Sequence, residues 1–180
     1  MRVIAGKYKG RTLFSPKDQS VRPTTDRIKE NVFNLLQSRM NGAAFLDLFG
    51  GSGAMTVEAL SRGASRAVIA DASRESVALI KKNFQKVGVG KEAQLFELSY
   101  DLVLKRLAGE KFDIVYLDPP YRAEYYEDIL EGILQNGLLS EGGVVVFEHA
   151  TERAFPDAEG YRSLDRRKYG SVTLELLVKA

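Results

Sequence analysis

From residue 44 onward, short apolar runs that suit buried strands alternate with amphipathic segments that suit helices. A regular alternation of this kind predicts a mostly parallel sheet with helices on both faces. Two further strand-like runs near the C-terminus, joined by Tyr169-Gly170-Ser171, predict an antiparallel hairpin at the edge of that sheet. The predicted strands are residues 44–49, 67–70, 93–98, 112–117, 144–147, 161–168 and 172–178, and the predicted helices between them are residues 54–62, 73–84, 101–107 and 124–134.

The first 43 residues have a different character. Residues 2–14 predict two short strands in a small β-hairpin, and residues 26–40 predict a helix that Thr25 or Asp26 can cap. Residues 1–29 carry a net charge of +6, whereas the remaining 151 residues carry −4. We therefore predict a basic arm, residues 1–29, that binds a polyanionic substrate, and a main domain, residues 30–180. A solvated edge hairpin would explain the same charge equally well.

Composition excludes several classes of site. The chain of 180 residues has no cysteine and one histidine, His149, so it cannot form a disulfide, a thiolate metal site or a site with several histidines. We expect no metal. No apolar run approaches the ~20 residues of a membrane helix, and the N-terminus lacks the apolar region of a signal peptide. The expectation is a cytoplasmic protein with no membrane contact.

A glycine-rich turn follows the first predicted strand. Asp47 lies in that strand, and Phe49-Gly50-Gly51-Ser52-Gly53 leads into the next helix. Such a turn lets a ligand approach the backbone. The dinucleotide-binding pattern would place its third glycine at position 56, which is Thr56, and the phosphate-binding lysine of a P-loop is also missing.

A second acidic position follows the next strand. Asp71, with Ala72 after it, stands where an acid accepts hydrogen bonds from ribose hydroxyls. Asp47 would repel a pyrophosphate but can pair with the ammonium group of an amino acid. An adenosine joined to an amino acid satisfies both positions, so the pattern predicts S-adenosylmethionine as the cofactor.

Asp118-Pro119-Pro120-Tyr121 follows the fourth predicted strand. Two consecutive prolines force an extended segment and fix the acceptors around Asp118. A rigid array of acceptors can hold both N–H groups of a planar amine, and Tyr121 offers a ring face on which a base can stack. The pattern therefore predicts methylation of an exocyclic amino group, with catalytic roles for these four residues.

The motifs together resemble a known family. Residues 47–53 are similar to the cofactor motif of class I methyltransferases, and residues 118–121 are similar to the tetrapeptide of amino-methyltransferases. Residues 2–6, 10–11, 22–27 and 58–64 resemble the RsmD family of bacterial methyltransferases, which act on the N2 amine of a guanine in 16S ribosomal RNA. The resemblance covers essentially the whole chain. It implies a Rossmann-like class I methyltransferase fold in which residues 30–180 are the catalytic domain.

The resemblance also implies roles for particular residues. The cofactor's amino-acid part would lie against Asp47 and Gly50 to Gly53, its ribose against Asp71, and its adenine near Ser99 and Tyr100, where the family commonly has Asp or Asn. Asp118 and the Pro119 carbonyl would hold the guanine amine. Substrate RNA would contact Lys7, Lys9, Arg11, Arg22, Thr24, Thr25 and Arg27. The implied partner is 16S ribosomal RNA within a small-subunit particle, bound by a monomer.

Other functions compete with this hypothesis. An adenine-N6 or another exocyclic-amine methyltransferase would use the same tetrapeptide, and a non-catalytic RNA-binding module would need no cofactor. Thr56 and the tetrapeptide count against a nicotinamide-dependent oxidoreductase. His149 has no assigned role, and a basic stretch in the C-terminal hairpin fits either RNA contact or a solvated face, namely Arg162, Arg166, Arg167 and Lys168.

Overall fold

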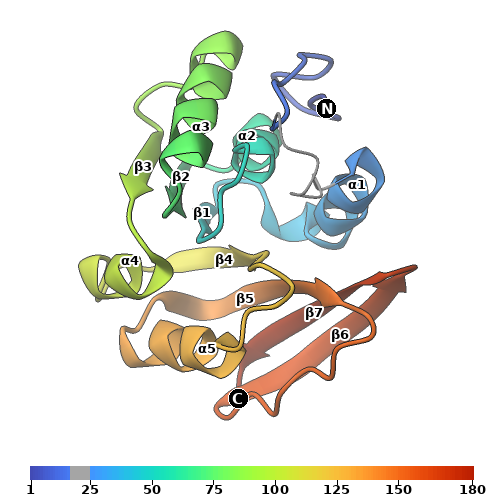
Figure 1. Cartoon of the computed structure of the whole chain (residues 1–180), viewed down its shortest axis with the longest axis vertical. Helices are drawn as coiled ribbons and strands as arrows, with labels where there is room; N and C mark the ends of the chain where they lie inside the picture. Colours follow the sequence, from blue (N-terminus) through green and yellow to red (C-terminus); the bar gives the residue numbers. More distant parts are fainter. Residues whose placement is uncertain (17–24) are drawn as a thin grey trace.

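The seven strands form one sheet in the order β3-β2-β1-β4-β5-β7-β6 (Figure 1). The structure is a computed structural model that describes residues 1–16 and 25–180. β1 to β5 are parallel, and β7 runs antiparallel between β5 and β6. The strands are β1 (Ala44–Asp47), β2 (Arg66–Asp71), β3 (Ala93–Glu97), β4 (Phe112–Leu117), β5 (Leu139–Ala150), β6 (Tyr161–Tyr169) and β7 (Val172–Lys179).

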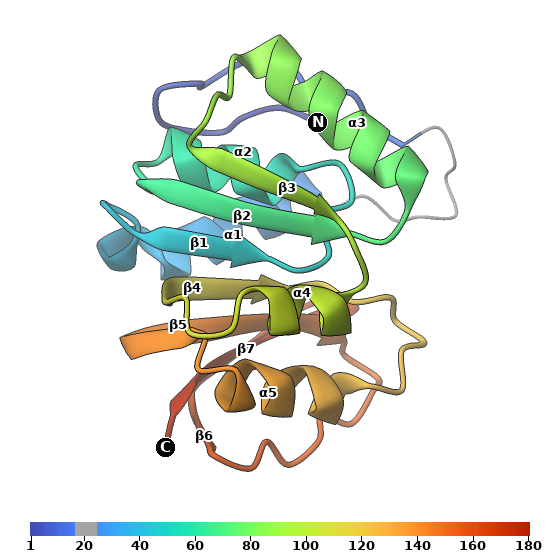
Figure 2. The ribbon, with the colours of Figure 1, turned by 90° about the vertical axis from the view of Figure 1, so that its left-hand side faces the viewer.

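Helices cover both faces of the sheet. One face carries α1 (Asp26–Leu35), the 3-10 turn η1 (Gln37–Arg39), α2 (Ala54–Ser61) and α3 (Arg74–Val87). The other face carries α4 (Tyr100–Arg106) and α5 (Tyr126–Gln135), which cross in front of the strands in Figure 2. The predicted fold class is therefore confirmed, including the antiparallel hairpin at the C-terminus.

The alternation of side chains along the central strands explains the two layers. Phe45, Ile114 and Tyr116 face α1 and α2, whereas Leu46 and Val115 face α4 and α5. All five side chains are buried, because a parallel strand in the middle of such a sheet is covered on both sides.

Residues 1–16, the N-terminal loop, form a hairpin-like turn with a single bridge between Arg2 and Thr12. The sequence predicted two short strands here, but turns occupy residues 5–10 and leave no regular ladder. Val3, Tyr8 and Leu13 are nonetheless buried against α2 and α3. The loop therefore contributes three side chains to the core.

Two other predicted elements differ from the structure. The predicted helix over residues 26–40 ends at Leu35, and η1 follows it. β5 begins at Leu139, five residues before the predicted strand. The sequence Ser140-Glu141-Gly142-Gly143 looks like a turn. In the structure these residues lie within β5, where the register of the pairing with β4 is irregular.

None of the helices in the described part of the chain is both long and apolar enough to span a bilayer. The same residues contain no cluster of acidic or histidine side chains that could hold a metal ion.

Candidate functional site

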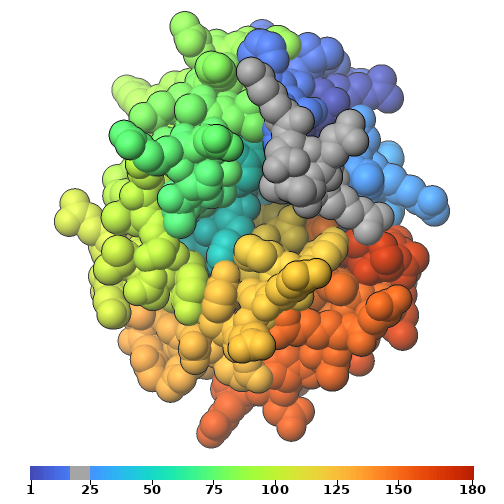
Figure 3. All heavy atoms as spheres, viewed as in Figure 1, coloured from blue at the N-terminus to red at the C-terminus, as the bar shows by residue number. Residues whose placement is uncertain are grey.

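The predicted site residues gather where the strand order reverses. β1 lies between β2 and β4, and the carboxyl ends of these parallel strands meet at one edge of the sheet. In open α/β sheets, ligands bind at this switch point. Figure 3 shows a hollow on this side of the molecule, and its floor has the teal colour of the segment that follows β1.

The glycine turn has the shape of a backbone cradle. The Gly50 N–H donates to the Ala70 carbonyl over 2.8 Å, and the Gly53 N–H donates to the Gly50 carbonyl over 2.7 Å. Gly51 has φ +55°, and a Cβ there would meet no atom within 4 Å. The space in front of Gly51 is therefore open to a ligand.

Gly50 is required for a different reason. A Cβ at this position would lie 2.6 Å from the Ile69 side chain. An alanine here would need Ile69 to move, so the packing of this chain favours glycine.

Asp71 fastens the glycine turn to the end of β2. Its Oδ2 accepts the Gly51 N–H over 2.9 Å, and its Oδ1 accepts the Ser73 N–H over 2.8 Å. An ionised carboxylate has about four acceptor positions. The carboxylate therefore keeps capacity for two more donors, such as vicinal hydroxyl groups. Ala72, next in the chain, is exposed.

Asp47 lies behind the turn with 1% of its surface exposed. The Thr56 hydroxyl donates to its Oδ2 over 3.0 Å, and the Phe49 N–H donates to its Oδ1 over 3.4 Å. Burial raises the pKa of the Asp47 carboxyl from 3.8 to about 7. Thr56 stands where the dinucleotide-binding pattern would have its third glycine. Here its hydroxyl group holds the Asp47 carboxyl in place.

The tetrapeptide leaves β4 directly beside this turn. Asp118 is half-buried, Pro119 is buried and Pro120 is exposed. The Ala123 N–H donates to the Pro120 carbonyl over 2.8 Å, which closes a turn after the prolines. Arg153 donates to the Tyr121 carbonyl over 3.0 Å, so the segment is anchored at its far end as well.

A row of aromatic rings borders the site on the α4 side. The Phe49 and Tyr100 ring centroids are 6.1 Å apart, and Tyr100 stacks on Tyr125 at 4.8 Å and 16°. Ser99, the N-cap residue of α4, uses its hydroxyl to bond Asp101 over 2.5 Å. This row offers ring faces to an adenine or a guanine, while the predicted adenine contacts of Ser99 and Tyr100 stay predictions.

The predicted RNA-binding residues divide into three groups. Lys7, Lys9 and Arg11 are exposed on the N-terminal loop, although Arg11 also donates to the Val87 carbonyl. Thr25 caps α1 by accepting the Ile28 N–H, and Arg27 is exposed on the first turn of that helix. Arg22 and Thr24 lie outside the described residues. Contact of any of these residues with RNA stays a prediction.

The boundary between the predicted basic arm and catalytic domain falls within α1. Lys29, the last residue of the arm, has a fully buried side chain. Its ammonium lies 3.4 Å from Glu58 and also donates to the Arg2 carbonyl. Glu58 in turn accepts the N–H groups of Ile4 and Ala5 over 2.9 and 3.0 Å. Here the chain's first residues are joined to α1 and α2, and the division at residue 29 stays a prediction.

Sequence reasoning missed several residues that build the site. Asn83 of α3 donates to the carbonyls of Ser52 and Phe14, which ties the N-terminal loop to the glycine turn. Tyr116 donates to the buried Glu148 over 2.6 Å just behind the tetrapeptide. The signal for Asn83 was a polar residue on the apolar side of a helix. The signal for Glu148 was a carboxylate at the end of an apolar run.

Four features together define the class I methyltransferase fold. They are the sheet order, the glycine turn after β1, the acid after β2 and the tetrapeptide after β4. Comparisons with known proteins agree. The model of the family described as "Conserved hypothetical protein 95" matches residues 1–178. The chain belongs to this family, the RsmD family, as its sequence resemblance predicted.

Individual relatives cover nearly the whole chain. Ribosomal RNA small subunit methyltransferase D of Escherichia coli K12 is 32% identical over 168 residues, which are 93% of this chain and 84% of that protein. The protein of the same name from Haemophilus influenzae is 29% identical and covers 98% of this chain and 92% of its own length. The solved structure of a hypothetical protein from Thermus thermophilus matches with a TM-score of 0.84 at 31% identity, covering 98% of both chains.

Proposed function

We propose that this protein transfers a methyl group from S-adenosylmethionine to the exocyclic N2 amine of a guanine in 16S ribosomal RNA. One observation carries the proposal: the tetrapeptide that follows β4, which is suited to hold a planar amine, lies next to the glycine turn that follows β1. The two strands are neighbours, with Leu46 paired to Val115 and Asp47 to Tyr116. Two relatives that cover almost all of this chain are named as methyltransferases of small-subunit ribosomal RNA, which supports the choice of RNA.

The residues present fit S-adenosylmethionine. Open space in front of Gly51 admits the amino-acid part, and the two spare acceptor positions of Asp71 suit the ribose hydroxyls. Asp47 can pair with an ammonium group, which would favour its ionised form. When bound, the cofactor supplies a methyl group on a sulfonium, an activated electrophile.

The protein's contribution to the reaction is position and electrostatics. Asp118 and the Pro119 carbonyl accept the two N–H groups of the amine, so that its lone pair is turned toward the cofactor side of the site. A hydrogen bond to a carboxylate also raises the electron density of the amine. Orientation alone can lower a barrier by ~7–11 kcal/mol in favourable cases. The proton leaves after transfer, so a strong general base is not required.

Tyr121 supplies the ring on which the target base stacks, and Arg153 fixes that residue by its bond to the Tyr121 carbonyl. We propose further that the enzyme acts in the cytoplasm as a monomer, on a guanine within a small-subunit particle.

The test is transfer of a tritiated methyl group to 16S ribosomal RNA and to small-subunit particles that lack the modification, followed by digestion to nucleosides. N2-methylguanosine at one position is the expected product. N6-methyladenosine would mean that the same site acts on adenine. Absence of S-adenosylmethionine binding and of transfer would leave an RNA-binding module as the function.

A further inference from the structure

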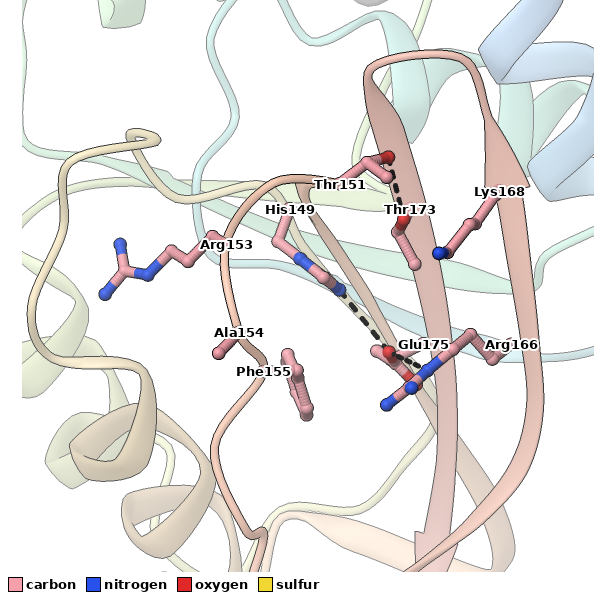
Figure 4. A pocket seen from close by; sticks show the side chains of 9 residues that line it. All are labelled: His149, Thr151, Arg153, Ala154, Phe155, Arg166, Lys168, Thr173 and Glu175. Atoms are coloured by element: carbon pink, nitrogen blue, oxygen red, sulfur yellow. Dashed lines mark hydrogen bonds and ion pairs between the residues drawn. The ribbon is translucent and has the colours of Figure 1, made fainter.

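A pocket lies beside the proposed active site, at the carboxyl end of β5 (Figure 4). It opens on the face of the C-terminal hairpin that continues the α5 layer, where the Phe155 ring lies 5.1 Å from the rings of Phe147 and His149. Its lining comes from β5, β6, β7 and the segment after β5, namely His149, Thr151, Arg153, Ala154, Phe155, Arg166, Lys168, Thr173 and Glu175.

Strand register explains why these residues meet. Lys168, Thr173 and His149 form one row across β6, β7 and β5, and Arg166 and Glu175 belong to the next row. Alternation along β6 places Arg166 and Lys168 on one face and Arg167 on the other, and the register shift between Ser163 and Asp165 puts Arg162 on the face of Arg167. Arg166 and Lys168 line the pocket, whereas Arg162 and Arg167 stand opposite Val178 and Leu174, residues of the other face.

The charges around the pocket favour an anion. Arg166 and Lys168 line the pocket with one carboxylate, Glu175, which is 1% exposed, whereas the Arg153 guanidinium points away toward Tyr121 and Tyr126 (Figure 4). Glu175 Oε1 lies 2.5 Å from Arg166 Nε and 3.4 Å from His149 Nε2, so its charge is already balanced within the protein. The Lys168 side chain is exposed, and its ammonium group has no hydrogen bond or ion pair with another residue of the described chain. That ammonium group is available to a ligand.

The pocket is joined to the proposed active site. Arg153, which lines the pocket, donates to the carbonyl of Tyr121 over 3.0 Å. Leu117 pairs with Phe147, so the end of β5 lies next to the start of the tetrapeptide. An RNA strand that places a base against Tyr121 therefore carries its neighbouring nucleotide toward this pocket.

We infer that the pocket binds the RNA nucleotide next to the methylated one, with its phosphate held by the Lys168 ammonium group. This inference rests on the proposed function. Cationic side chains and hydroxyl groups are the usual ligands of RNA phosphates, and the Phe155 ring gives the sugar or base an apolar surface. Arg166 serves mainly to balance Glu175.

Charge reversal on a single strand tests the pocket. Lys168→Glu and Lys168→Ala are compared with Arg162→Glu and Arg162→Ala, because both residues are exposed on β6 but only Lys168 lines the pocket. The dissociation constant for 16S RNA in unmodified small-subunit particles is measured at two salt concentrations. Binding of S-adenosylmethionine and the melting temperature check that every variant is folded, and methyl transfer by the wild-type enzyme is measured on the same particles.

Lys168→Ala should weaken RNA binding about tenfold, since a hydrogen bond to a charged group is typically worth a factor of about ten or more. Lys168→Glu should weaken it further, and the dependence on log salt should fall by about one unit. Both Arg162 variants should stay within about twofold of the wild type. Equal effects of Lys168→Glu and Arg162→Glu would overturn the pocket while leaving the proposed function intact. A wild-type enzyme that neither binds the particles nor methylates them would overturn both.

Discussion

Asp71 has two roles at the residue scale, because it holds the glycine turn and is the predicted ribose contact. Asp71→Ala should weaken binding of S-adenosylmethionine by ~1.5–3 kcal/mol, the usual effect of losing a charged hydrogen-bonding partner. Glu97→Ala is the matched control, since Glu97 pairs with Asp71 across β2 and β3 but is exposed and bonded to Arg74. Calorimetric titration of both variants measures the difference. Equal affinities in the two folded variants would remove Asp71 from the cofactor site.

Asp47 makes stability depend on pH. Burial raises its pKa from 3.8 to about 7, so the folded chain binds this proton more tightly than the unfolded chain. The contribution of this group to stability is complete below pH 3.8, and it falls as the pH rises toward about 7. Asp47→Asn should remove that decline, so that the free energies of unfolding at about pH 5 and about pH 8 differ less than in the wild type.

Urea unfolding at the two pH values measures this effect. Asp113→Asn is the control, because Asp113 accepts hydrogen bonds from Ala44 and Ser140 at the opposite edge of the sheet. A wild-type protein and an Asp47→Asn variant with parallel pH profiles would show that the pKa of Asp47 is not raised in the folded chain.

The N-terminal loop is held to α2 by a buried charge. Glu58 holds two backbone N–H groups of this loop together with Lys29 and Arg62. Removing one member of a buried ion pair costs about 3–5 kcal/mol, because it leaves the partner without a counter-charge. Glu58→Ala should therefore destabilise the fold by about this amount and expose residues 1–16 to proteases. Glu110→Ala, which breaks the exposed pair with Arg66 at 3.1 Å, should cost at most about 1 kcal/mol.

The same element carries the predicted RNA-docking surface. Lys7→Ala with Lys9→Ala should weaken RNA binding and flatten its salt dependence by about one unit per lost phosphate contact. Arg11 is kept, because its bond to the Val87 carbonyl holds the loop in place. Lys105→Ala with Arg106→Ala removes the same charge at the far end of α4, away from the site edge. Filter binding at low and high salt compares the two double variants, and identical salt slopes would mean that the loop is structural only.

Elements that obey a simple period could be predicted, and elements fixed by distant contacts could not. The buried strands β1 and β4 were evident from their apolar runs, and the acids and turns at their ends located the site. By contrast, the burial of Tyr8 and Lys29 depends on α2, which is distant in the sequence. The position of Arg162 on the face away from the pocket depends on a bulge that has no local signature.

At the scale of the whole molecule, the site is made of strand ends that the sheet brings to one edge. Each has one proposed function: the turn after β1 and Asp71 would bind the cofactor, and the tetrapeptide after β4 would hold the amine. The N-terminal loop and the pocket of the C-terminal hairpin flank this edge. Cofactor binding and methyl transfer should therefore be separable by mutation.

The most direct test is the single-turnover rate of Asp118→Ala at saturating RNA and S-adenosylmethionine, measured beside its affinity for the cofactor. Loss of a group that positions the reacting amine should slow transfer about a hundredfold or more. Cofactor affinity should stay closer to the wild type than that of Asp71→Ala, because Asp118 acts on the substrate. Transfer at the wild-type rate by a folded Asp118→Ala variant would contradict the assignment of the tetrapeptide as the amine-binding site.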